Sequence, residues 1–528
     1  MLRVFQNDLQ DPTRFVITLE LVPGREVTGR ALDTVMGIAR DAFADGRISA
    51  VSITDNPGGN PSLSPDVLGH QIFGIGMDVI VHFTCRDANR VGMESRALQL
   101  AMMGMKNILA LTGDYTGAGF AGQGAPVFDL DSVSLLAMLA MLNERLAAAG
   151  DPDGFFAGCA ASPFKTSAGE TAAQYAKLCR KRAAGAQFVI SQLGYDAGRF
   201  HQMVGTTRTM GLDLPLLGSV YVLTPRAARI MNAGQVPGVV VSDRLCRQVG
   251  REWTDRDAGR RAAVERAARL AAVLKGLGFR GIHIGGIHRD FSLVGRILDR
   301  LAEIEDRWTA FLDQFDGPEP AAAPDADPSG APACALGAGS PPALDPLEKA
   351  HFHFMRLAHA AFFRREGAAA GLWHAVSRSL DGHAAGRMLA QTLEDPVKRL
   401  LLGCRHCGDC AIQHLAFLCP ESQCPKHTRN GACGGSRNGR CEVRPERECV
   451  WYRAWRRWAA AGETYRLAEG CVPPRLWALN DTSSWLNFHL GRDHQGNGAA
   501  FTRYCRSREC RLAGNRPTPG GGQVADEG

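Results

Sequence analysis

A short apolar run followed by a glycine and an aspartate sets the strongest constraint on the fold of this chain. Residues 108–111 read Ile-Leu-Ala-Leu, which is typical of a parallel strand covered on both faces. Gly113 permits a sharp turn at the carboxyl end of that strand, and Asp114 follows directly. In α/β folds this end of the strands carries the chemistry, although an aspartate here can equally be a helix N-cap.

The same pattern recurs along the first half of the chain and predicts eight strands. We expect them at residues 14–20, 48–54, 78–84, 106–111, 155–160, 187–192, 214–218 and 281–285. Helix-like stretches separate them, at 27–44, 94–103, 130–148, 171–184 and 257–277. Eight such units favour an α/β fold of the (β/α)8 TIM-barrel type. A doubly wound open sheet is the alternative, but no Gly-x-Gly-x-x-Gly follows the first strand, which disfavours its dinucleotide-binding form.

Polar side chains end nearly every predicted strand, whereas the strand bodies are apolar. Any one of them could be a cap or a satisfied core group. In a barrel, however, all of them converge on one mouth and predict a functional site there. These residues are Glu20, Thr54, Asp55, His82, Thr84, Asp114, Ser162, Gln192 and His283.

Length and composition indicate more than one domain. A chain of 528 residues exceeds one ordinary domain. We expect the barrel at 1–312, a Pro/Ala-rich linker at 313–345, a mostly α-helical, cysteine-rich metal-binding domain at 346–514 and a disordered tail at 515–528. No long apolar run and no signal peptide are found, so we expect a cytoplasmic protein without membrane association.

The net charge of +6 is mild for this length and does not indicate a nucleic-acid partner. Residues 451–458 interleave aromatic and basic side chains, which is one pattern of nucleic-acid binding. Packing of a Trp-rich helix against the metal-binding domain is the favoured interpretation of this stretch, and we expect no nucleic-acid partner.

Eight of the 16 cysteines fall between residues 404 and 449. In a reducing compartment this density predicts metal binding rather than disulfides. The run begins Cys-x-x-Cys-x-x-Cys and contains two Cys-Pro pairs, which is similar to iron–sulfur ligation without the ferredoxin spacing. Zinc, with His406, His414 or His427 as a fourth ligand, is the alternative. The predicted metal ligands are Cys404, Cys407, Cys410, Cys419, Cys424, Cys433, Cys441 and Cys449.

Several stretches at the predicted strand ends together resemble one family. They are residues 19–23, 51–54, 82–87, 109–114, 183–186 with 191–192, and 281–283. In this order they resemble methylenetetrahydrofolate reductase, a flavin-dependent (β/α)8 barrel. The segment from about Pro346 onward is similar to the cysteine-rich domain that accompanies this reductase in some anaerobic bacteria.

The resemblance implies reduction of 5,10-methylenetetrahydrofolate to 5-methyltetrahydrofolate, with hydride from a reduced flavin, FAD or FMN. Glu20 matches the acid that protonates N10 and contacts the folate, a role for which a raised pKa is suited. Asp114 matches the carboxylate that stabilises the cationic iminium and tunes the flavin. Gln192 matches a folate-contacting glutamine. The flavin-contacting positions are matched by Thr54, His82, Asp114 and Lys181.

The sequence departs from the family pattern at two strand ends. Thr112 stands where the family usually has arginine, and Ser162 where it has tyrosine. These changes leave open whether the flavin is FAD or FMN. An iron–sulfur domain would deliver electrons from an electron-transfer partner protein, whereas a zinc domain would leave NAD(P)H as the donor. We also expect a homo-oligomer.

Two other function classes compete with the reductase. One is a barrel that binds a pterin or corrinoid and transfers methyl groups without redox chemistry. The other is an electron-transfer or scaffold subunit whose barrel has lost activity, which the presence of Glu20 and Asp114 argues against.

Overall fold

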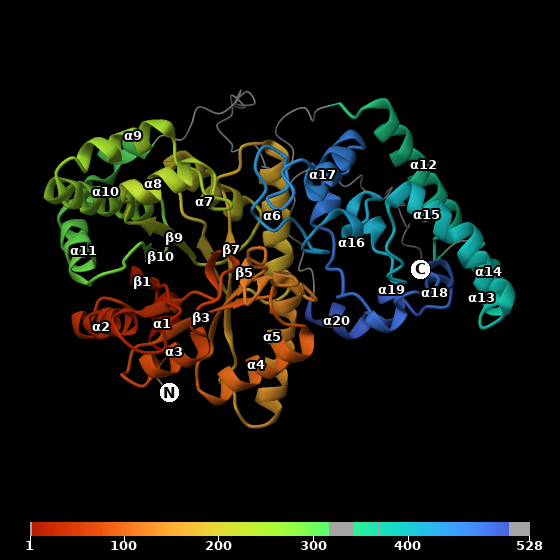
Figure 1. Ribbon diagram of the computed structural model, residues 1–528, viewed down its shortest axis with the longest axis horizontal. Helices are drawn as coiled ribbons and strands as arrows, with labels where there is room; N and C mark the ends of the chain where they lie inside the picture. Colours follow the sequence, from red (N-terminus) through yellow and green to blue (C-terminus); the bar gives the residue numbers. More distant parts are fainter. Residues whose placement is uncertain (1–2, 316–342, 367–368, 506–528) are drawn as a thin grey trace, which may run out of the picture.

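The computed structural model describes residues 3–315, 343–366 and 369–505. Figure 1 shows a barrel with its surrounding helices, coloured red to green, beside a helix-rich part coloured teal to blue. The predicted linker at 313–345 lies mostly outside the described residues, and the predicted tail at 515–528 lies wholly outside them. No described helix is both long and apolar enough to cross a membrane.

Eight parallel strands close into a barrel, in the order β1-β10-β9-β8-β7-β4-β3-β2. Closure is made by β1, which pairs with β10 on one side and with β2 on the other. This confirms the predicted fold class, and each strand lies within a few residues of its predicted range. The strands are β1 (Val16–Leu21), β2 (Ala50–Ile53), β3 (Val79–Thr84), β4 (Asn107–Leu111), β7 (Phe156–Ala161), β8 (Phe188–Ser191), β9 (Leu216–Tyr221) and β10 (Gly281–Gly285).

Helices cover the outside of the barrel (Figure 1). Most begin at a Ser, Thr, Asp or Asn whose side chain accepts a backbone N–H of the first turn, which fixes where each helix starts. They are α2 (Arg30–Asp45), α3 (Pro65–Phe73), α4 (Arg90–Met102), α5 (Ser132–Ala148), α6 (Ala168–Ala183), α7 (Ala197–Thr209), α8 (Pro225–Asn232), α9 (Asp243–Glu252), α10 (Arg256–Gly276), α11 (Ser292–Ile304) and the 3₁₀ segment η2 (Glu305–Phe315). A short hairpin, β5 (Ala118–Gly119) with β6 (Gly122–Gln123), follows β4.

Helix α1 (Val4–Gln10) closes the amino-terminal end of the barrel. Phe5 is fully buried and packs edge-on against Phe188, with ring centroids 5.2 Å apart. Its backbone N–H donates to Asp78 Oδ2 at 3.0 Å. The barrel core is thus sealed at this end, so ligands reach its interior from the opposite, carboxyl end.

The second part consists of helices around an irregular cysteine-rich segment. Its helices are α12 (Pro346–Phe362), α13 (Ala370–Leu380), α14 (Ala384–Leu389), η3 (Ala390–Glu394), α15 (Asp395–Leu402), η4 (Ile412–Leu415), α16 (Pro420–Gln423), α17 (Val450–Ala460), η5 (Thr464–Leu467), η6 (Trp477–Leu479), α18 (Ser484–His489), α19 (His494–Asn497) and α20 (Ala499–Tyr504). Trp451, Trp455 and Trp458 of α17 are buried. The aromatic-basic stretch is therefore a packing element.

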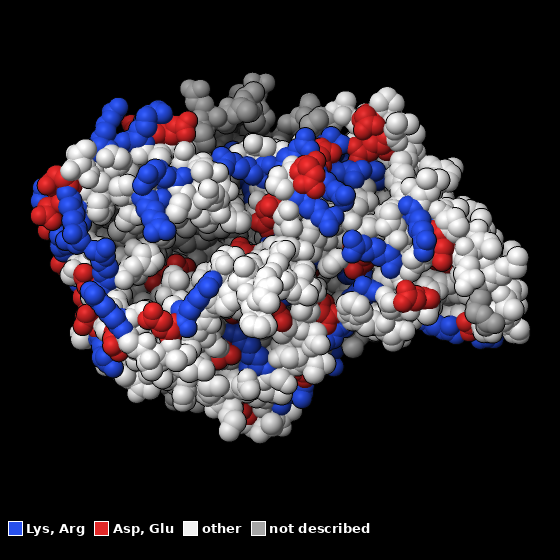
Figure 2. All heavy atoms as spheres, viewed as in Figure 1, with Lys and Arg blue, Asp and Glu red and all other residues white. Residues whose placement is uncertain are grey.

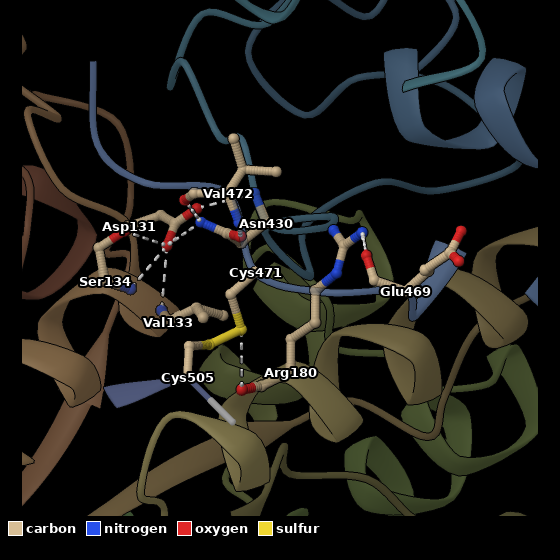
Figure 3. Close-up of a disulfide and its surroundings, with 9 residues drawn as sticks. All are labelled: Asp131, Val133, Ser134, Arg180, Asn430, Glu469, Cys471, Val472 and Cys505. Atoms are coloured by element: carbon tan, nitrogen blue, oxygen red, sulfur yellow. Dashed lines mark hydrogen bonds between the residues drawn. A yellow bond between two sulfur atoms is a disulfide. The ribbon is translucent and has the colours of Figure 1, made fainter. Parts of the chain in front are cut away.

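The two parts pack closely along α6. A Cβ on Gly169 of α6 would lie 2.2 Å from the Trp455 ring, so only glycine permits this approach of α17. Beside it, Asn430 N–H donates to Asp131 Oδ2 at 3.0 Å, and Asp131 also caps α5 (Figure 3). The N-cap of a barrel helix thereby also anchors the second domain.

A disulfide joins Cys471 to Cys505 near the same contact (Figure 3). Cys471 Sγ lies 3.8 Å from the carbonyl oxygen of Arg180 on α6, and the Arg180 side chain donates to Glu469 O at 3.2 Å. The sequence analysis assigned no disulfide. This bond ties α20, the last described helix, to the chain segment that runs along the barrel.

Candidate active site

A cavity of about 300 Å³ lies at the carboxyl ends of the barrel strands. Its volume is at the lower end of the range for small-molecule sites. The structure brings together here all of the catalytic, flavin-contacting and folate-contacting residues predicted from the sequence. The lining includes Glu20, Thr54, His82, Asp114, Ser162, Lys181, Gln192 and His283. Basic and acidic side chains are interspersed over the face of the molecule shown in Figure 2.

Glu20 forms one end of a polar chain across two neighbouring strands. Its Oε2 lies 3.9 Å from His283 Nε2, and His283 Nδ1 lies 2.8 Å from Thr18 Oγ1. Thr18 and His283 are register partners in the β1–β10 pair, so the backbone ladder fixes their contact. His82 completes a group whose ligand atoms all lie within 4.8 Å of those of Glu20 and His283.

The electrostatics of Glu20 differ from the expectation. Burial raises the pKa of the carboxyl group, but the His283 ring at 3.9 Å and the charges of nearby histidines outweigh this effect. The pKa of Glu20 therefore lies below its usual value, and the expected raised pKa is wrong.

His82 differs from His283 in having an unused ring nitrogen. Burial lowers the pKa of His82 to about 4, so the ring is neutral near pH 7. Its Nε2 is buried without a hydrogen-bond partner in the described part of the chain. Thr54 Oγ1 and Gln174 Nε2, which line the same cavity, are also buried without a hydrogen-bond partner among the described residues. Buried polar atoms without partners are costly, so this arrangement fits a polar ligand.

Asp114 lies where the strand-and-turn pattern predicts. Gly113 adopts a φ of +92°, which favours glycine, and delivers Asp114 to the rim of the cavity. Asp114 Oδ2 accepts the Gly58 N–H at 3.0 Å. Asp55, by contrast, is held by Arg96 at 2.8 Å and by the backbone N–H of Thr84. Asp55 is therefore engaged in structural contacts, whereas Asp114 keeps oxygen atoms available to the cavity.

Lys181 and Gln192 lie on the opposite side of the barrel mouth from Glu20's strand. Burial lowers the pKa of Lys181 to about 8, and its ammonium donates to Ala160 O. Gln192 Nε2 donates to Pro237 O at 3.2 Å. Both side chains line the cavity.

One wall of the cavity comes from the second domain, which the sequence analysis did not anticipate. Lys426, Cys433, Gly434, Gly435 and Glu442 all line it. Lys426 Nζ donates to Gly113 O at 2.7 Å and forms an ion pair with Glu442. The Lys426–Gly113 contact spans 313 residues of sequence, so no local pattern could have revealed it.

The eight predicted metal ligands fall into two groups. Four thiols line one small cavity and form what we term the proximal set, namely Cys424, Cys433, Cys441 and Cys449. The other four interact with one another electrostatically and form the distal set, namely Cys404, Cys407, Cys410 and Cys419. Cys433 belongs to the proximal set and also lines the active-site cavity.

Each set contains thiols whose surroundings disfavour the bare thiolate. Burial raises the pKa of Cys410 and of Cys433 to about 12, with neighbouring thiol and carboxyl groups adding to the shift. Four sulfur atoms gathered in this way fit a metal centre, because a bound cation supplies the missing charge compensation.

Two of the three histidines considered as zinc ligands are engaged elsewhere, whereas His427 Nδ1 is buried without a hydrogen-bond partner among the described residues. His406 Nδ1 lies 2.7 Å from Asp395, His414 Nε2 lies 3.2 Å from His494, and His427 Nδ1 lies 3.5 Å from Glu421.

Comparisons with known proteins agree along most of the chain. A family model described as methylenetetrahydrofolate reductase matches residues 6–302, and one described as methylene-tetrahydrofolate reductase C terminal matches residues 385–478. A probable methylenetetrahydrofolate reductase (NADPH) of Caenorhabditis elegans is 27% identical over 221 residues, which cover 40% of this chain and 31% of that protein. The chain thus spans about a third of the length of this curated relative.

Two solved structures are similar at low identity. One is an uncharacterized protein from Clostridium thermocellum that binds two copies of 5-methyl-5,6,7,8-tetrahydrofolic acid, with 11% identity, a TM-score of 0.39, and coverage of 58% of this chain and 99% of that chain. The other is an EDTA monooxygenase from Chelativorans sp. BNC1, with 14% identity, a TM-score of 0.35, and coverage of 56% and 95%.

Proposed function

The chain belongs to the methylenetetrahydrofolate reductase family, and from this premise we propose that it reduces 5,10-methylenetetrahydrofolate to 5-methyltetrahydrofolate with a bound flavin. The observation that carries the proposal is the convergence of Glu20, His283, Asp114 and Gln192 on one cavity at the carboxyl ends of the strands. Each of these side chains would make a different contribution, namely proton donation, charge stabilisation or binding of the pterin ring.

The Glu20–His283 pair supplies the proton that opens the five-membered ring at N10. Glu20 is the donor, and the His283 ring lies 3.9 Å from its carboxyl group. Folate entering the mouth displaces water from Glu20, and this further desolvation favours the neutral carboxylic acid. Thr18 holds His283 by its Nδ1, so that Nε2 keeps facing the carboxyl group.

Asp114 provides the negative charge that ring opening requires. Opening leaves a cationic iminium at N5, and a carboxylate fixed at the cavity rim stabilises this charge. The Gly58 N–H holds one carboxylate oxygen of Asp114, which orients the other. Gln192 lines the cavity and carries an amide that can pair with the pterin ring.

The residues of the mouth fit a flavin. The orphaned Thr54 Oγ1, His82 Nε2 and Gln174 Nε2 offer hydrogen bonds to a polar heterocycle, and Lys181 offers a cation to a phosphate. A bound flavin supplies hydride chemistry, which the side chains themselves cannot. FMN rather than FAD is favoured, because the cavity of about 300 Å³ is bounded on one side by the second domain.

We propose that the two cysteine sets hold iron–sulfur clusters and that the proximal set is the one next to the flavin site. The grouping of the thiols in fours, and the engagement of His406 and His414 by other side chains, support iron–sulfur over zinc. Electrons would then come from a partner protein through the second domain. A homo-oligomer and a cytoplasmic location belong to the same proposal.

A spectrum of anaerobically purified protein, with iron and zinc analysis of the same sample, tests the proposal. We expect a flavin band, broad absorbance near ~400 nm from iron–sulfur centres, and reduction of methylenetetrahydrofolate by the chemically reduced protein. Zinc without iron would instead make NAD(P)H the donor. Absence of flavin would overturn the reductase and favour a methyl-transfer barrel.

A further inference from the structure

Lys426 of the second domain lies in the wall of the barrel's cavity. Its side chain is only 3% exposed, yet it contacts the cavity together with Glu20, Asp114 and Gln192. A buried cation at the mouth of a barrel needs an explanation, because desolvating an ammonium group is expensive. Two partners, Gly113 O and the Glu442 carboxylate, compensate part of this cost.

The position of Lys426 is fixed by contacts on every side. Two barrel lysines hold the segment that carries Glu442, since Lys165 donates to the carbonyl oxygens of Gly434 and Ser436 and Lys177 donates to Gly431 O at 3.3 Å. The Lys426 ammonium also lies 5.8 Å from the centroid of the Phe128 ring. The cation is therefore a rigid part of the mouth.

The ammonium group keeps one donor for a ligand. It has three N–H bonds, of which Gly113 O and Glu442 take two among the described residues. Asp114 is close enough to interact with it electrostatically. The mouth thus contains an Asp114 carboxylate and, next to it, a cation supplied by the other domain.

We propose that Lys426 is a binding residue of the active site, which places a fixed positive charge against the bound flavin and raises its reduction potential. The inference rests on the proposed function. A cation favours the electron-rich reduced flavin over the oxidised one, so it makes the flavin easier to reduce. Glu442 is the counter-ion that moderates this effect. The second domain would then complete the active site electrostatically, in addition to carrying metal centres.

The test is an anaerobic redox titration of flavin-loaded full-length protein and four variants. Lys426→Met removes the charge and keeps the length of the side chain, whereas Lys426→Arg keeps the charge. Glu442→Gln removes the counter-ion. Lys106→Met is the control, because Lys106 is also a buried lysine, but it lies beside Asp151 at the opposite end of the barrel and does not line the cavity.

We expect Lys426→Met and Glu442→Gln to shift the flavin potential in opposite directions. Lys426→Met makes the flavin potential more negative by at least about 30 mV. For a two-electron couple this shift corresponds to a tenfold change in the equilibrium constant between reduced and oxidised flavin. Lys426→Arg keeps most of the wild-type potential, Glu442→Gln shifts the potential to more positive values, and Lys106→Met leaves it unchanged.

Two results overturn the inference. One is an unchanged potential in Lys426→Met with flavin still bound, which would make Lys426 a docking residue only. The other, which applies even if Lys426→Met does not fold, is a Glu442→Gln potential that is unchanged or more negative. A wild-type protein that binds no flavin would instead overturn the proposed function, and the two failures are thereby distinguished.

Discussion

His283 Nε2 lies 3.9 Å from Glu20 Oε2 at the mouth of the barrel, and the contact joins the first and last strands. Because these two strands are hydrogen-bonded neighbours in the barrel, the sheet and not a flexible loop sets this distance. Both side chains line the cavity at the carboxyl ends of the strands.

Substitution Glu20→Gln removes the acid while keeping the size of the side chain. We expect folate reduction to fall by about 10² to 10⁴, the usual contribution of a general acid. Reduction of the flavin by its electron donor should persist, because it needs no acid at N10. Rapid-mixing measurements of the two half-reactions separate these effects. Normal folate turnover would falsify the assignment of Glu20.

Substitution His283→Gln changes the pH dependence in a defined direction. Burial raises the pKa of Glu20, and the nearby His283 ring makes the largest contribution that brings it below the usual value. Without the imidazole, the effect of burial remains and the pKa of Glu20 rises. The acid then keeps its proton to higher pH, so the pH at which folate reduction declines moves upward. If the pH at which folate reduction declines stays the same or falls, His283 does not control the pKa of the acid.

Substitution Asp114→Asn removes one negative charge and keeps an oxygen for the Gly58 N–H. We expect folate reduction to slow by tenfold or more, since one charge-stabilising interaction is typically worth at least ~1.4 kcal/mol. The flavin potential should become more positive. Steady-state kinetics measure the rate of folate reduction, and a redox titration measures the flavin potential. If neither changes, Asp114 has no part in the mechanism.

Lys181 should make flavin binding depend on pH. Burial lowers the pKa of its ammonium to about 8, so the ligand-free site loses its positive charge as the pH rises through that value. Affinity for FMN should therefore weaken above about pH 8, and Lys181→Met should bind weakly without this dependence. Lys106→Met, at the opposite end of the barrel beside Asp151, is the control. Fluorescence titration measures all three, and identical pH profiles would contradict the assignment.

The metal content should fall in two separate steps. If each cysteine set holds a four-iron cluster, the wild type contains about eight irons per chain, and Cys433→Ser or Cys419→Ser about four. Cys246→Ser, in α9 outside both sets, should leave the iron content unchanged. The Cys433 variant should also slow electron delivery to the flavin, because Cys433 lines the cavity. Equal iron in all four proteins would exclude these ligands.

The barrel and most of its mouth could be predicted because parallel strands covered on both faces read as apolar runs. Glu20 and His82 lie near the carboxyl ends of such strands and Asp114 follows one, so their convergence was implied by the topology alone. The direction of the Glu20 pKa shift could not be predicted in the same way. It depends on the nearby His283 ring, whose position relative to Glu20 cannot be read from the sequence.

Contacts between distant parts of the chain account for the rest of what was missed. The pairing of Cys471 with Cys505 was not assigned, since connectivity among many cysteines cannot be deduced from their order. The division of the eight clustered cysteines into two sets depends on the turns of an irregular segment. Lys426 and Glu442 resemble any other surface charges in the sequence, and only their burial identifies them.

The wall that the second domain contributes to the mouth also bears on how this chain can change in evolution. Gly113 and Lys426 lie 313 residues apart and meet across the domain boundary. The acceptor is the backbone carbonyl oxygen of Gly113, which any residue at that position would offer, so the contact constrains position 426 without requiring a matching change at position 113. A barrel without the second domain would lack this cation. An alignment restricted to the barrel therefore omits one side of the pocket.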